Sequence, residues 1–89
     1  MKPECIDLDV SLLEAPQPLE RIMQAAGQLR KGAYIKAIHR MHPCMLADLL
    51  QKNGFAHEIV HGQKVLIYIW HDSDTQTKEY IDGLIRTES

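Results

Sequence analysis

Apolar residues recur at two spacings in the first third of the chain. Ile6, Leu8 and Val10 alternate with Asp7 and Asp9, a pattern that predicts a short strand with one buried face. Prolines at positions 16 and 18 then predict a helix entrance, because proline is tolerated in the first turn of a helix. Apolar residues three and four positions apart predict a helix that continues to a cationic, glycine-containing stop at residues 30–32.

The rest of the chain continues in the same two patterns. Strands are predicted at residues 34–39, 55–61 and 65–71, and a second helix is predicted over residues 44–52, ahead of the stop at Asn53-Gly54. The resulting order is β-α-β-α-β-β. We therefore expect an α+β two-layer sandwich, with a mixed four-stranded sheet and two helices on one face.

The last two strands form a predicted hairpin. Gly62-Gln63 fits a two-residue turn with glycine first, which pairs Ile59 with Leu66 and Phe55 with Trp70. Both faces of this hairpin are then largely apolar. A layer of helices on one side leaves the other face exposed to solvent, so a further element is needed to cover it.

The end of the chain supplies a candidate cover. Four apolar side chains in residues 77–85 have helical spacing: Tyr80, Ile81, Leu84 and Ile85. This helix packs either on the sheet of its own chain or against a second subunit. We expect residues 1–74 to form the domain and residues 75–89 to form a C-terminal helical tail.

Composition favours a small folded domain. The 89 residues suffice for one core, and fractions of 45% hydrophobic and 25% charged residues argue against disorder. No apolar run approaches the roughly 20 residues that span a bilayer, and the first residues lack the apolar core of a signal peptide. A cytoplasmic protein is expected, in which Cys5 and Cys44 stay reduced.

Charge is unevenly distributed along the chain. The formal charge is −4 over residues 1–20, +5 over residues 21–52 and −3 over residues 53–89, which sums to −2. The middle segment forms either a basic patch or a set of solvated loop and helix ends. The negative net charge argues against a dedicated nucleic-acid binder, which is usually basic.

Two stretches of the sequence resemble a known family. Leu8-Asp9-Val10, followed by Ala15-Pro16-Gln17-Pro18-Leu19, resembles the SirA/TusA-like sulfur-carrier superfamily. The pattern His39-x-x-x-Pro43-x-x-Leu46-x-x-x-Leu50-x-x-x-Gly54-Phe55 is similar to a cysteine-lacking bacterial offshoot of that superfamily, whose function is unknown. The resemblance covers residues 7–72 and implies the same element order.

The resemblance implies a lost activity. In the superfamily a Cys-Pro-x-Pro motif places a persulfide-carrying cysteine at the start of the first helix, where the partial positive charge of the helix stabilises a thiolate. Here Pro16 and Pro18 remain, but Ala15 stands at the cysteine position. Alanine carries no persulfide, so the sulfur transfer of the family does not extend to this position.

A second set of candidate residues lies after the strand at residues 34–39. His39, His42 and Cys44 combine imidazole and thiol ligands, which suit zinc, and the interleaved Met41 and Met45 add thioethers, which suit copper. Cys44 is also placed for a lowered thiol pKa at a helix start. The alternative is a turn with ordinary histidines and a small buried cysteine, because the spacing matches no standard metal motif.

The remaining polar candidates favour structural roles. Asp7 and Asp9 share the solvent face of a strand. The predicted hairpin register puts His57 and His61 on one face and His71 on the other, so these histidines form no single site.

These observations favour a non-catalytic protein-interaction or regulatory module. The partner is a protein of unknown identity, and a homodimer through the sheet face or the C-terminal helix is a further possibility; no membrane partner, cofactor or confident metal is expected. The alternatives are a thiol- or metal-handling protein that uses Cys44 with His39 and His42, and a nucleic-acid binder that uses the basic middle segment.

Overall fold

The computed structural model describes residues 2–41 and 45–88. The elements follow in the order β1 (Glu4–Asp9), α1 (Gln17–Gly27), β2 (Ala33–His39), α2 (Leu46–Lys52), β3 (Phe55–Val60), β4 (Val65–His71) and α3 (Thr75–Glu88). This order confirms the predicted α+β class with its mixed four-stranded sheet.

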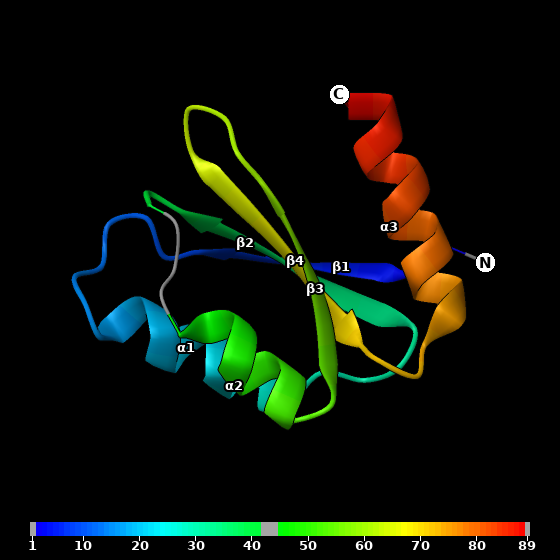
Figure 1. Ribbon diagram of the computed structural model, residues 1–89, viewed down its shortest axis with the longest axis horizontal. Coiled ribbons are helices and arrows are strands. Elements are labelled where there is room, and N and C mark those ends of the chain that lie inside the picture. Colours follow the sequence, from blue (N-terminus) through cyan, green and yellow to red (C-terminus); the bar gives the residue numbers. More distant parts are fainter. Residues whose placement is uncertain (1, 42–44, 89) are drawn as a thin grey trace.

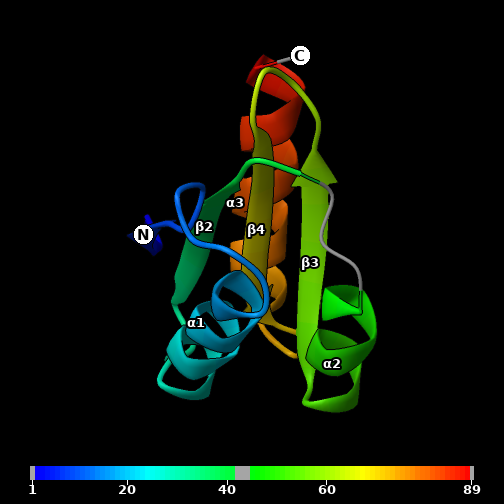
Figure 2. The same ribbon diagram turned by 90° about the vertical axis from the view of Figure 1, so that its left-hand side faces the viewer.

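The sheet has the strand order β1-β2-β4-β3. β1 and β2 are parallel, joined by the crossover through α1, and the other two pairings are antiparallel. Figure 1 shows the strands between two groups of helices, and Figure 2 shows α1 and α2 in front of the sheet with α3 behind it. The two faces of the sheet are therefore covered by different parts of the chain.

Each face of the sheet carries its own apolar core. The core under α1 and α2 contains Ile22 and Leu50 from the helices and Ile35, Ile67 and Ile69 from the strands. The core under α3 consists of four buried residues: Tyr34, Tyr68, Trp70 and Ile81. The C-terminal helix thus packs on the sheet of its own chain.

The predicted register of the β3–β4 hairpin is wrong by one residue. Val60 pairs with Leu66 and Phe55 with His71, because four residues, 61–64, separate the strands instead of two. A shift of one residue moves every side chain to the opposite face. Ile59 consequently faces α1 and α2 rather than sharing a face with Trp70.

The helix boundaries also differ from the prediction. α2 begins at Leu46 rather than at residue 44, and Met45 before it has a left-handed backbone with φ of 68°. α3 extends beyond the predicted residues 77–85 at both ends. None of the helices in the described ranges has the length and apolar character needed to cross a membrane.

The start of α3 is tied to the loop between α1 and β2. The Asp74 carboxylate accepts hydrogen bonds from the Gly32 N–H at 2.7 Å, the Thr77 hydroxyl at 2.6 Å and the Thr77 N–H at 3.2 Å. The bonds from Thr77, with that from Gly32, lower the pKa of Asp74. Beside it, Nε2 of His71 donates to the carbonyl oxygen of Leu29, which only accepts. Residues 29–32 and 71–77 therefore form one connected end of the molecule.

Candidate functional site

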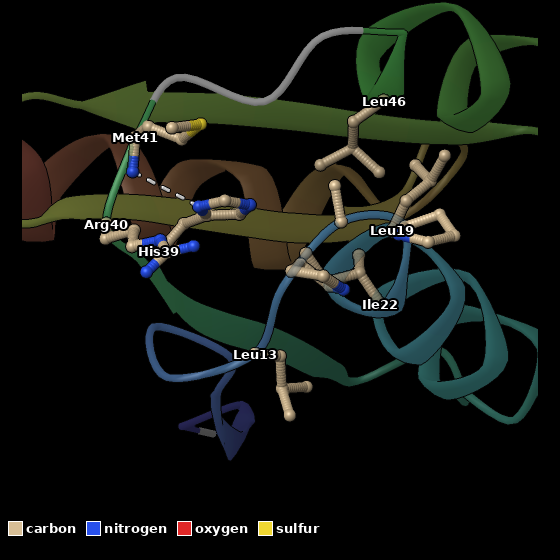
Figure 3. Close-up of a pocket in the computed structure, with 10 residues that line it drawn as sticks. Leu13, Leu19, Ile22, His39, Arg40, Met41 and Leu46 are labelled. Atoms are coloured by element: carbon tan, nitrogen blue, oxygen red, sulfur yellow. Dashed lines mark hydrogen bonds between the residues drawn. The ribbon is translucent and has the colours of Figure 1, made fainter.

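A cavity of about 320 Å³ lies where β1 and β2 lead into the two helices that follow them. Because β1 and β2 are parallel, their carboxyl ends meet at the same edge of the sheet, a common location for binding sites in such folds. The cavity is lined by the β1–α1 loop (Leu13, Ala15 and Pro16), α1 (Pro18, Leu19 and Ile22), the end of β2 and the residues after it (His39, Arg40 and Met41), and α2 (Leu46). Figure 3 shows this arrangement.

His39 is the buried polar residue of the cavity. Its side chain is 8% exposed, and Nδ1 accepts a hydrogen bond from the Met41 N–H at 3.2 Å. Burial, followed by the charge of Arg40, lowers the pKa of His39, so the ring is neutral at pH 7. Since Nδ1 accepts, the single proton of the neutral ring lies on Nε2. In Figure 3 this second nitrogen faces the interior of the cavity, toward Leu19 and Leu46.

The helix entrance forms the opposite wall. Pro16 is the N-cap residue of α1, and no side chain caps the helix there. The Gln17 N–H donates to the carbonyl of Glu14 at 2.9 Å, and Pro18 has no N–H. Within the described residues no backbone or side-chain acceptor meets the Leu19 N–H, which leaves this donor at the positive end of the helix dipole.

Exposed apolar side chains lie on, or next in the chain to, the segments that line the cavity. In the part of the chain that the structure describes, the large hydrophobic residues that are exposed are Leu12 at 90%, Met41 at 58% and Met45 at 70%. Met41 lines the cavity, and the other two are the chain neighbours of the lining residues Leu13 and Leu46. We call Leu12, Met41 and Met45 the apolar rim.

The structure brings together two sets of residues that the sequence treats separately. Ala15, Pro16 and Pro18 from the helix entrance line the same cavity as His39. Ala15 and Pro16 are exposed, whereas Pro18 is buried.

The proposed thiol and metal cluster is only partly described. His42 and Cys44 lie outside the described residues, so the geometry of the cluster with His39 is not defined. Within residues 2–41 and 45–88, no three His, Cys, Asp or Glu side chains come together as a metal site.

The other polar candidates are placed as structural residues. Asp9 accepts hydrogen bonds from the hydroxyl and N–H of Ser11, at 2.6 and 3.0 Å, which lower its pKa. The prediction that His71 and His57 lie on opposite faces of the hairpin is wrong, because the observed register puts both on one face. His61 lies in the loop after β3.

Six lining residues are not among the site residues that the sequence predicts: Leu13, Leu19, Ile22, Arg40, Met41 and Leu46. The sequence indicates Met41 as an extra thioether ligand, and Leu46 as a position of the family-like pattern, but neither as a cavity residue. Arg40 and Met41 directly follow the predicted strand, and strand ends at the carboxyl edge are where sites form. That rule is the signal that identifies them.

The chain matches no protein-family model, no curated protein and no solved structure. Its resemblance to the SirA/TusA-like superfamily therefore depends on its own short motifs. The geometry of the cavity and of the apolar rim is the basis for a functional proposal.

Proposed function

We propose that the chain is a small non-catalytic protein-interaction module of the SirA/TusA-like type, in which alanine replaces the persulfide cysteine. Ala15 supports the first half of this proposal. It is exposed at the helix entrance, beside the positive end of α1, where a thiolate is stabilised in a sulfur carrier. The entrance is retained without a nucleophile at this position.

The apolar rim carries the second half of the proposal. Exposed apolar side chains that cluster around a concave site are typical of surfaces that bind another molecule. Met41 lines the cavity, and Leu12 and Met45, which are exposed, directly adjoin the lining residues Leu13 and Leu46 in the chain. Methionine is also suited to interaction surfaces, because its flexible side chain adapts to the partner.

The absence of sulfur transfer is tested with a cysteine desulfurase and labelled cysteine. Wild-type protein is expected to gain no persulfide at the helix entrance, whereas Ala15→Cys is expected to gain one there, located by mass spectrometry of the proteolytic peptides. A stoichiometric persulfide on Cys44 of the wild type would contradict the proposal and favour a thiol-handling protein.

The docking surface is tested by comparing which proteins wild type and variants retain from a lysate of the source organism. Met45→Asp and Leu12→Asp are expected to lose partners that the wild type retains, because a carboxylate in an apolar interface is desolvated without a counter-charge. Lys31→Asp, at the other end of β2, is the matched control and is expected to keep them. Equal retention by the rim variants and the control overturns this surface.

A further inference from the structure

The cavity beneath the apolar rim has an apolar floor. Ile22 and Leu46 are almost completely buried, and Leu19 is half-buried between them and the helix entrance. The volume of about 320 Å³ is roughly twice that of an apolar cavity that holds benzene, about 150 Å³. An unbranched chain of about six to eight carbons is therefore of a suitable size.

One side of the cavity presents hydrogen-bond donors and positive charge. Nε2–H of His39 faces the interior, and the N–H of Leu19 lies at the positive end of α1 without an acceptor among the described residues. Arg40 lines the cavity and is exposed, so its permanent charge lies at the mouth. These three groups donate hydrogen bonds, and none of them accepts one.

Negative charge is missing from the described lining. Glu14 and Glu20 flank the helix entrance in sequence, but both are exposed and neither lines the cavity. No buried side-chain nitrogen or oxygen among the described residues lacks a partner, so Nε2–H of His39 is accessible from the cavity and open to a ligand or water. An anionic group satisfies the donors and the charge together, and charge-assisted hydrogen bonds of this kind are stronger than neutral ones.

We infer that the cavity binds a small monocarboxylate with an apolar chain, the carboxylate at His39, Leu19 and Arg40 and the chain on the floor formed by Ile22 and Leu46. This ligand site goes beyond docking of a protein on the apolar rim. Because Met41 belongs to both the cavity and the rim, a bound ligand changes the surface that a protein partner meets.

Octanoate, kept below its micelle concentration, is the probe. Titration of ¹⁵N-labelled full-length protein is expected to give saturable, one-site shifts of the amides of Leu19, Ile22, His39 and Leu46. The neutral analogue octanol is expected to bind at least about fivefold more weakly, because it loses the charge-assisted bonds. Octylammonium, with the opposite charge, is expected to bind more weakly still.

Three variants separate specific binding from general hydrophobic adsorption. Ala15→Phe fills the mouth from an exposed position and is expected to abolish binding, with an unchanged thermal unfolding midpoint as evidence that the fold is intact. Arg40→Gln is expected to weaken octanoate about fivefold to tenfold without changing octanol. Lys31→Gln removes the same charge beyond the other end of β2, a strand about 20 Å long, and is expected to have no effect.

The inference is overturned by any of three results: no saturable shifts with octanoate, equal affinity for octanoate and octylammonium, or unchanged binding to Ala15→Phe. Its failure is distinguishable from failure of the proposed function. Loss of partners on Met45→Asp, together with an absence of octanoate binding, leaves protein docking intact and removes only the ligand site.

Discussion

Met45 combines a strained backbone with an exposed side chain, although its carbonyl oxygen accepts a hydrogen bond from the Leu49 N–H at 3.2 Å. Its φ of 68° lies in the left-handed region, which costs a non-glycine residue about 1–2 kcal/mol, and its side chain is 70% exposed. The conformation turns the chain into α2 and leaves the side chain on the apolar rim. The position therefore carries a backbone cost that packing does not offset.

Met45→Gly is expected to raise the free energy of unfolding by up to about 1 kcal/mol, because glycine relieves the left-handed conformation while its freer unfolded chain cancels part of the gain. Urea unfolding measures the change. Met41→Gly is the control, since Met41 is also exposed but has no positive φ, and it is expected to lower stability. A less stable Met45→Gly protein contradicts the strain argument.

His39 makes the stability of the domain depend on pH. Its pKa is lowered in the folded protein, mainly by burial, whereas an unfolded histidine titrates near 6.5. Well above pH 6.5 the ring is neutral in both states and contributes no dependence. As the pH falls below this value, the unfolded chain takes up a proton that the folded protein does not, so stability decreases.

His39→Gln is therefore expected to lose less stability than the wild type between pH 7.5 and pH 5.5. Glutamine does not titrate, and it keeps an acceptor for the Met41 N–H. Urea unfolding of both proteins at the two pH values gives the change in unfolding free energy with pH for each. Subtracting one change from the other cancels the contribution of the other titrating groups. An identical pH-dependent loss in both proteins argues against a perturbed His39.

At the scale of elements, Asp74 joins a helix start to a distant loop. Its carboxylate accepts from the N–H of Thr77, three residues on, which is the geometry of a helix N-cap, and from Gly32 across the molecule. The lowered pKa means that this stabilisation is fully present above about pH 4 and is lost as the pH falls through the folded-state pKa.

Asp74→Ala is expected to cost about 1–2 kcal/mol of unfolding free energy at pH 7, since it removes the cap and the bond to Gly32. Asp74→Asn keeps a good capping group and is expected to cost less. Chemical unfolding at pH 7 and in acid is the measurement. The difference in unfolding free energy between wild type and Asp74→Asn should become smaller in acid. A difference that grows in acid would contradict the lowered pKa of Asp74.

The order of elements was predictable from apolar periodicity, but their pairing was not. β4 has the predicted boundaries, because Val65 to His71 is a long apolar run between polar turns. The register of the hairpin failed because Gly62-Gln63 satisfies a two-residue turn, whereas the strands close with a longer loop. With apolar residues on both faces of β4, alternation does not fix the register from sequence.

At the scale of the whole molecule, α3 covers the sheet face that α1 and α2 leave open. Ile81 is completely buried against Tyr68 and Trp70, and Tyr80 lies 6.0 Å from Tyr34 between ring centroids. Trp70 is the only tryptophan in the chain and is 3% exposed, so its fluorescence reports on this contact.

Removal of residues 75–89 is expected to expose Trp70, shift its emission to longer wavelength and lower the thermal midpoint or cause association. Ile81→Ala is the milder variant and is expected to cost about 2–4 kcal/mol, because it leaves a cavity in the core. Gln76→Ala, at an exposed position of the same helix, is the matched control. A truncated protein of unchanged stability and emission contradicts a structural role for α3.

The candidate site was predictable only in parts, because it forms from four segments. Ala15, Pro16 and Pro18 were found through their motif, and His39 through its neighbours in sequence. Nothing in the sequence places Ala15 across a cavity from His39, since that proximity depends on β1 and β2 being adjacent and parallel. The cavity therefore depends on the order and direction of the strands in the sheet, which local sequence patterns do not specify.

The hydrogen bonds around Asp74 lie where β2 begins, and the cavity lies where β2 ends. In evolutionary terms, the two ends of the strand are under different constraints. Substitutions at Ala15 or Arg40 leave the bonds of Asp74 and His71 untouched, so descendants of one ancestral chain are free to change the exposed lining of the cavity while inheriting the same sheet. A saturation-mutagenesis map of folding should accordingly show more tolerance at the exposed Ala15 and Arg40 than at Asp74 and Gly32.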